Sequence, residues 1–399
     1  MNLEKITDER LFGNTIMQKT LDLKEGGYSL YHSVGHRPNG SEEMATAVSE
    51  FTNIWSSPIS DVWPKTLNAV EEFRESFSKI LGPEATADEV GLVDSVTSGF
   101  LRIIDGLGLD YLEGKSVLIA DDAFPSLHFL LQGMEKILKF KTKRVAIRQG
   151  QFHVEDSDFI KELNTDNVAL ALVTWVSSTT SAMVNLEEIA DAAPENCVLV
   201  CDVTQCLGVR RLNLPVRFDA VISTSLKWLC GTAGAGVVWV RDSRINLFTP
   251  NFRGWFSQEN PMNWDIDNFT LSTNSRRFEN GTPNPLPYIA SLPGLQWVVE
   301  GGNDLQEIKN RSMTKELIQL LINAEINIVT PIEQNSRGGS VMVNVGTIDN
   351  ANRIITDCAD ESVLIDNRGH ILRFSPGILT ESFAIDCFVD CLKKNITTD

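Results

Sequence analysis

Residues 201–236 read CDVTQCLGVRRLNLPVRFDAVISTSLKWLCGTAGAG, and the fold class is predicted from this stretch. An apolar run at 197–201 ends in Asp202, and a second run at 220–222 leads through a Ser/Thr cluster to Lys227. Short apolar runs bounded by turn residues are typical of buried parallel strands. We therefore expect a carboxylate and an amine at the carboxyl ends of strands, where open α/β sheets bind ligands.

Asp202 and Lys227 together suggest a cofactor site. A buried Asp facing a ring nitrogen and a Lys forming a Schiff base are what a pyridoxal phosphate (PLP) enzyme needs. Taken singly, each residue has a simpler explanation, a helix N-cap for the Asp and a solvated side chain for the Lys. The PLP hypothesis therefore depends on the rest of the chain.

The surrounding sequence alternates strands, loops and helices. Further strands are expected at 89–93, 116–120, 144–147, 168–176 and 237–240. Helical patterns cover most of 42–81 and 186–193, and further helices are expected at 294–301, 305–324 and 350–359. This alternation predicts an α/β fold with a large, mainly parallel, seven-stranded-type sheet between helices.

With 399 residues the chain is longer than one ordinary core. We expect an N-terminal segment at 1–25 that packs on the small domain, a large PLP-binding domain at 26–290 and a small α+β domain at 291–399, which closes in a hairpin. Residues 246–284 are rich in Asn, Trp, Phe and Pro and lack periodicity. A segment of that length without periodicity is usually functional.

The composition limits the partners. Fifty-three acidic side chains against 35 basic ones give a net charge of -18, which argues against nucleic acid and anionic membranes as partners. No apolar stretch has the length of a membrane span, and the first residues lack a signal-peptide core, so a cytoplasmic protein is expected. The seven cysteines show no C-x-x-C spacing, which indicates neither a disulfide framework nor a metal site.

The ordered motifs resemble a known family. Asp202, Gln205 and Gly208 form D-x-x-Q-x-x-G, followed by the Ser/Thr cluster, Lys227 and a glycine-rich turn. This order resembles the class V aminotransferase family of fold-type I PLP enzymes. Four further motifs look most like its kynureninase branch: DDAFPS at 121–126, RGWF at 253–256, RFENGTP at 277–283 and LRFSP at 372–376.

The resemblance implies a role for each matching residue. Lys227 would hold PLP as a Schiff base and then move the Cα proton, Asp202 would pair with the pyridine nitrogen, and Arg373 would grip the substrate α-carboxylate. Arg368 on the same hairpin is the competing arginine. The remaining cofactor contacts implied are Phe124 stacked on the ring, Gln205 and Ser178 beside it, and Val96, Thr97, Thr224 and Ser225 at the phosphate.

Trp255 and Thr282 match positions that the family supplies from the neighbouring subunit. The resemblance therefore implies a homodimer with the active site at the subunit interface. Kynureninases carry a Tyr immediately before the lysine, where this chain has Leu226. Cysteine desulfurases need a reactive Cys on a loop before the arginine, whereas Cys358 falls on a predicted helix.

The expected function is that of a PLP-dependent enzyme acting on an α-amino acid through an external aldimine and Cα deprotonation. Kynureninase-like cleavage or elimination at the side chain, as a lyase or hydrolase but not as authentic kynureninase, is the preferred outcome. Transamination is the alternative. A non-catalytic protein that keeps the fold for binding is the further alternative.

Overall fold

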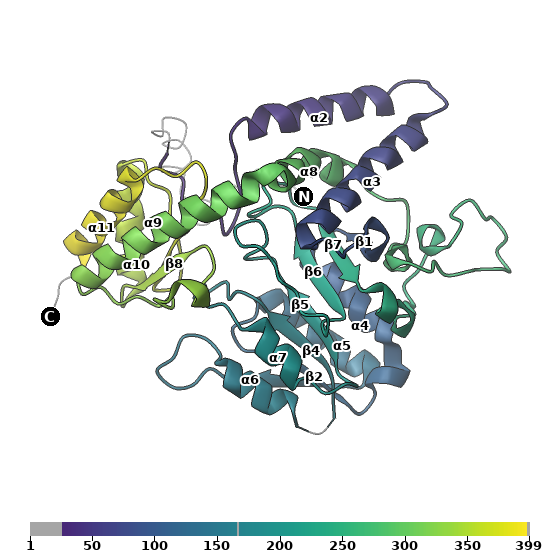
Figure 1. Ribbon diagram of the computed structural model, residues 1–399, viewed down its shortest axis with the longest axis horizontal. Coiled ribbons are helices and arrows are strands. Elements are labelled where there is room, and N and C mark those ends of the chain that lie inside the picture. Colours follow the sequence, from purple (N-terminus) through teal and green to yellow (C-terminus); the bar gives the residue numbers. More distant parts are fainter. Residues whose placement is uncertain (1–25, 166, 397–399) are drawn as a thin grey trace.

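The computed structural model describes residues 26–165 and 167–396, so the expected N-terminal segment at 1–25 lies outside the described residues. The larger part is built on a seven-stranded sheet of order β1-β7-β6-β5-β4-β2-β3 (Figure 1). In that order the strands are Val90–Val93, Gly236–Val240, Ala220–Thr224, Val198–Asp202, Val168–Thr174, Ser116–Ala120 and Lys141–Val145. The predicted mainly parallel α/β fold is confirmed.

Strand β7 differs from the expectation, because it runs antiparallel to both β1 and β6. Residues 225–235, which connect β6 to β7, contain no helix, and a parallel crossover normally needs one. The chain therefore turns back beside β6. The other strands share one direction, so their carboxyl ends meet at a single edge of the sheet.

Helices cover both faces of this sheet. Helices α4 (Val96–Leu112) and α5 (Pro125–Leu138) pack on one face, where Ile222 and Val238 belong to their core. The other face carries α3 (Val62–Leu81), α6 (Asp156–Leu163), α7 (Leu186–Ala192) and α8 (Leu286–Trp297), with α2 (Gly40–Trp55) packed against α3 and α8. Successive strand residues point to opposite faces, which explains why the central strands β5 and β7 are buried along their whole length, whereas the edge strand β3 is polar.

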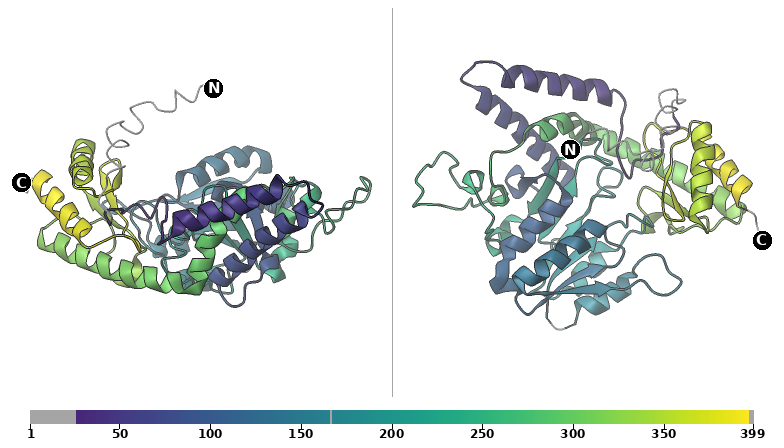
Figure 2. Two further views of the ribbon diagram at one scale, coloured as in Figure 1. Left: turned by 90° about the horizontal axis from the view of Figure 1, so that it is seen from above. Right: turned by 180° about the vertical axis from the view of Figure 1, so that it is seen from behind.

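The carboxyl-terminal part holds a three-stranded antiparallel sheet of order β8-β10-β9, at one end of the molecule (Figure 2). Its elements are β8 (Val341–Asn344), β9 (Asp366–Arg368), β10 (Ile371–Phe374), and helices α9 (Asn303–Asn323), α10 (Ile348–Asp360) and α11 (Phe383–Asn395). Residues 326–329 add one antiparallel bridge to this sheet, from Ile328 to Val343. Helix α11 follows the hairpin that was expected to close the chain.

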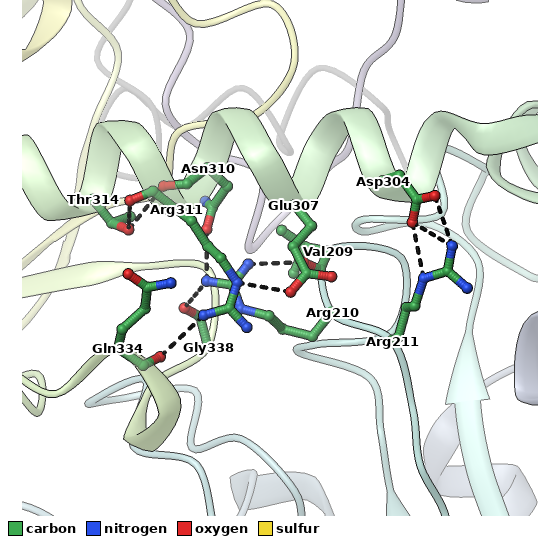
Figure 3. A network of polar contacts seen from close by, with 10 residues as sticks. All are labelled: Val209, Arg210, Arg211, Asp304, Glu307, Asn310, Arg311, Thr314, Gln334 and Gly338. Carbon is green, nitrogen blue, oxygen red and sulfur yellow. Dashed lines mark hydrogen bonds and ion pairs between the residues drawn. The ribbon is translucent and has the colours of Figure 1, made fainter.

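Helix α9 forms hydrogen bonds with both the part built on the large sheet and the carboxyl-terminal part (Figure 3). Arg210, beyond β5, donates from Nη2 to Asn310 Oδ1 at 2.9 Å and to the Gly338 carbonyl at 2.8 Å. Asn310 Nδ2 donates to the Pro376 carbonyl at 2.7 Å, and Gln306 Nε2 donates to the Trp228 carbonyl at 3.0 Å. The helix therefore fixes the backbone beside Arg373 relative to the backbone beside Lys227.

The aperiodic segment at 246–284 folds as loops with short 3-10 turns, among them η5 (Trp255–Ser257) and η6 (Ser275–Phe278). Part of it projects from the body at the right of Figure 1. Across residues 26–165 and 167–396, no helix combines the length and apolarity that a membrane crossing requires.

Candidate active site

A cavity of about 400 Å³ opens at the carboxyl edge of the large sheet, beneath the β9–β10 hairpin. Loops that follow β1, β2, β4, β5 and β6 all contribute to its walls. Nine of the predicted site residues line it: Val96, Thr97, Phe124, Ser178, Asp202, Gln205, Thr224, Lys227 and Arg373. The structure therefore brings together side chains that are spread over most of the sequence.

Lys227 lies three residues beyond the end of β6, with Nζ 5.8 Å from the centroid of the Phe124 ring. Burial lowers the pKa of this amine to about 8, although the Asp202 carboxylate acts in the opposite direction. Gly35 fixes the backbone here, because its N–H donates to the Leu226 carbonyl at 2.9 Å. A Cβ at Gly35 would lie 1.8 Å from the Lys227 carbonyl oxygen, so only glycine fits.

Asp202 ends β5 at the floor of the cavity and is 6% exposed. Its Oδ1 accepts the Thr204 N–H at 3.0 Å. Burial raises the pKa of this carboxyl, whereas the hydrogen bond with Thr204 and the charge of Lys227 act to lower it. A buried carboxylate with so little compensation favours a cationic partner in the cavity.

The start of helix α4 forms the opposite end of the cavity. Ser95 caps the helix by accepting the Ser98 N–H at 3.1 Å, and the first intrahelical bond runs from Gly99 N to Ser95 O at 2.9 Å. The amides of Val96 and Thr97 precede that bond, which is the usual arrangement of an anion site at a helix N-terminus. A Cβ at Gly236 would lie 2.9 Å from Ser95 N, so this glycine lets the helix start approach the sheet.

Arg373 extends from β10 and is 5% exposed. It donates from Nε to Asp366 Oδ1 at 2.8 Å and from Nη2 to Asp366 Oδ2 at 2.5 Å. His32 Nε2 lies 3.1 Å from the same Oδ2, and His32 Nδ1 lies 2.7 Å from Ser375 Oγ. Burial acts to raise the pKa of Asp366, but its contacts with His32 and Arg373 outweigh burial and lower it.

Two of the five guanidinium N–H groups of Arg373 are therefore used by Asp366, and three are left, two of which lie on the Nη1–Nη2 edge. That edge can still bind a carboxylate in a bidentate manner. Arg368, the competing arginine, also lines the cavity but is exposed, with Cζ 5.9 Å from the Phe124 ring centroid.

Three predicted residues do not reach this cavity. Ser225 turns away and donates from Oγ to the Thr232 carbonyl at 3.2 Å and to Ser291 Oγ at 3.0 Å. Trp255 stacks on Trp264 in the projecting segment, with ring centroids 5.8 Å apart, and Thr282 is exposed. Ser225 instead braces the turn before Gly231, whose N–H donates to the Ser225 carbonyl at 2.9 Å.

Sequence reasoning missed His32 and Asp366, which orient Arg373. His32 belongs to the segment at 26–33, whose residues Tyr28 and Leu30 bridge to Leu364 and Ser375. Asp366 and Arg373 are direct partners in the β9–β10 register. The sequence does carry a signal for this pair, because Asp366 and Arg373 are equally far from the turn at 369–370 and would therefore face each other across a hairpin.

The residues fit PLP. The cavity offers a helix start for the phosphate, the flat face of Phe124 for the ring, and the Asp202 carboxylate for a protonated ring nitrogen. Thr174 Oγ1 is also buried at the cavity without a hydrogen-bond partner among the described residues. A polar group left in this way is costly unless a ligand satisfies it.

Comparison with known proteins agrees with this chemistry. The family model "Aminotransferase class-V" matches residues 42–373. A probable cysteine desulfurase of Pyrococcus abyssi is 23% identical over 304 residues, which make up 75% of this chain and 73% of that protein.

Solved structures share the fold. The apo cysteine desulfurase from Thermococcus onnurineus NA1 superposes with a TM-score of 0.79 at 18% identity, covering 92% of this chain and 94% of that chain. The cystine C–S lyase C-DES, as a mutant with glycine covalently linked to its PLP cofactor, gives a TM-score of 0.80 at 15% identity, covering 95% of this chain and 99% of that chain. The family match extends over most of this sequence, and the cavity fits the cofactor, so the chain belongs to the class V aminotransferase family of fold-type I, PLP-dependent enzymes.

Proposed function

We propose that this enzyme cleaves or eliminates the side chain of an α-amino acid, in the manner of the kynureninase branch. The observation that supports it most is the placement of Lys227, Asp202 and an oriented Arg373 around one cavity. These groups can bind an amino acid, withdraw its Cα proton and compensate the resulting charge. Bound PLP supplies an electron sink for the carbanion at Cα.

Lys227 would hold the cofactor through its amine and would move the proton at Cα. An amine with a pKa of about 8 is partly neutral near physiological pH, which suits both a nucleophile and a general base. Asp202 keeps the ring nitrogen protonated, because the low-dielectric floor favours a charge pair over a lone carboxylate. Phe124, which lines the same cavity, would lie against the cofactor ring.

Arg373 orients the substrate. Asp366 occupies the Nε edge of its guanidinium, so a substrate α-carboxylate meets a planar fork whose direction is already fixed. His32, through Asp366, is a positioning residue. Gln205 and Ser178 line the cavity as the remaining polar contacts to the cofactor.

The relatives named cysteine desulfurase and cystine C–S lyase support a lyase. Within the described chain, however, no cysteine lines the cavity. Cys358, which precedes the hairpin, is fully buried on α10. The cleavage we propose therefore uses no protein thiol as a persulfide carrier.

Leu226 also lines the cavity, next to Lys227. An aliphatic side chain can neither donate a proton nor bind the phosphate, unlike the Tyr of kynureninases. We therefore propose that the substrate differs from kynurenine.

We further propose a homodimer in which the segment at 246–284 carries Trp255 and Thr282 to the partner's cavity. Large apolar side chains on this segment are exposed, including Trp264 at 75% and Ile266 at 95%. Exposed apolar patches of this kind mark protein interfaces. Sedimentation of the purified protein tests the dimer, and a Trp264→Ser, Ile266→Ser variant should shift it to monomer.

The reaction is tested by incubating the holoenzyme with an amino-acid panel that includes L-cystine, L-cysteine and L-kynurenine. Release of a side-chain fragment with PLP retained supports the proposal. Stoichiometric conversion of PLP to pyridoxamine phosphate, reversed by a keto acid, would replace it with transamination. An absorbance band that survives Lys227→Ala, or a protein that takes up no PLP, would favour the non-catalytic alternative.

A further inference from the structure

Three cysteines come together in the carboxyl-terminal part, on helices unrelated to the proposed catalytic groups. Cys358 lies on α10, and Cys387 and Cys391 lie on α11, which packs against it (Figure 1). All three Sγ atoms lie within 4.8 Å of one another, and all three are free thiols. The spacing of four residues places Cys387 and Cys391 on one face of α11.

The distances between the three Sγ atoms approach those between sulfur ligands of one metal ion. Three thiolates at about 2.3 Å from one tetrahedral ion lie roughly 3.8 Å apart, so small side-chain rotations close the site. Hydrogen bonds with Cys387 and Cys391 raise the pKa of Cys358, and a hydrogen bond from Cys358 lowers the pKa of Cys391. The three sulfurs are therefore already hydrogen-bonded to one another.

A cavity of about 380 Å³ beside Cys387 and Cys391 gives access from solvent. Its remaining lining residues are Asp357, Asp360, Glu361, Asp390 and Lys394. Lys394 is paired with Asp357 at 2.9 Å, so four carboxylates against one ammonium leave an excess of negative charge. Such a charge balance raises the local concentration of cations.

We propose that Cys358, Cys387 and Cys391 bind one thiophilic d10 metal ion, Zn²⁺ or Cu⁺, as three thiolates with a water at the open position. Thiolate sulfur is the ligand that these ions prefer. Binding releases the three thiol protons to solvent and transfers no electrons. Because the ligands come from α10 and α11, the ion clamps these helices together, independently of the proposed amino-acid chemistry.

The test uses the reduced, metal-stripped holoenzyme under anaerobic conditions. Zn²⁺ is titrated in competition with the chelator 4-(2-pyridylazo)resorcinol, and Cu⁺ in competition with bathocuproine disulfonate, which distinguishes the two ions. Wild type should bind one equivalent of one of them. Loss of a residue that only hydrogen-bonds to a metal ligand lowers metal affinity 10- to 100-fold. Cys387→Ala and Cys391→Ala each remove a ligand itself, so either variant should weaken metal binding by roughly 100-fold or more.

Cys197→Ala is the matched control, because Cys197 is a buried thiol of the large domain outside this cluster. It should bind metal as wild type does. The PLP absorbance band and far-UV circular dichroism report whether each variant is folded. No binding by reduced wild type, full binding by folded Cys391→Ala, or an equal loss in Cys197→Ala would overturn the proposal. So would a cluster that closes to a disulfide on exposure to air with Zn²⁺ present.

Discussion

Replacing Arg373 with lysine tests which arginine receives the substrate carboxylate. Arg373→Lys keeps the positive charge but removes the planar fork. In the native protein one edge of that fork is bonded to Asp366 and the other faces the cavity. The lysine ammonium can contact either Asp366 or a substrate carboxylate. Unlike the guanidinium, it cannot offer a pair of parallel N–H groups to each of these carboxylates at once.

The magnitude follows from the lost contact. One charge-assisted hydrogen bond contributes about 1.5–3 kcal/mol. At about 1.36 kcal/mol for each tenfold change, Arg373→Lys should weaken amino-acid binding roughly 10- to 150-fold. Arg368→Lys is the matched control: because Arg368 is exposed and its charge is kept, we expect a change within about threefold.

The assay titrates each holoenzyme with L-alanine and follows the PLP absorbance. L-alaninol, which has the amine but lacks the carboxylate, serves as the second probe and should bind wild type and Arg373→Lys alike. Melting temperatures establish that the variants are folded. A larger loss of L-alanine affinity in Arg368→Lys than in Arg373→Lys would refute the assignment, as would equal losses for both probes.

Three further predictions follow from the cavity. Asp202→Asn removes the charge that faces the ring nitrogen, so PLP affinity should fall by roughly tenfold or more, measured by dialysis against PLP; unchanged affinity together with full activity would contradict the role of Asp202. Because burial lowers the pKa of Lys227 to about 8, its neutral fraction grows as pH rises, so PLP capture by the apoenzyme should increase about tenfold between pH 7 and pH 9 and then level off. A lysine with the ordinary pKa would still capture more PLP as pH rises above 9. Free lysine in the same buffers serves as that control, and a Lys227 curve that matches it would contradict the lowered pKa. Gly35→Ala should displace the Lys227 backbone and lower both the melting temperature and the PLP band. Gly133→Ala, in helix α5 where a Cβ meets nothing within 4 Å, should lower neither, because alanine favours a helix over glycine.

Most of the fold could be predicted because the strands carry a local signal. The run at 116–120 is predicted with the bounds that β2 has, since five apolar or small residues between turn signals describe a strand buried on both faces. The direction of β7 carries no such signal. It depends on the length and conformation of the connection at 225–235, which the apolar pattern does not encode.

The site shows the same division between local and non-local information. Thr224 and Ser225 are adjacent, and adjacent side chains of an extended chain point to opposite sides, so only one of them could face the cavity; alternation alone would have excluded one of the pair. His32 has no comparable signal, because it reaches Asp366 across 334 residues.

The cysteine cluster is likewise invisible to spacing rules, since Cys358 joins Cys387 and Cys391 only through the packing of two helices. Spacing motifs detect ligands that one local turn brings together, and they miss sites that tertiary packing assembles from separate elements. A chain without C-x-x-C can therefore still place three sulfurs around one point.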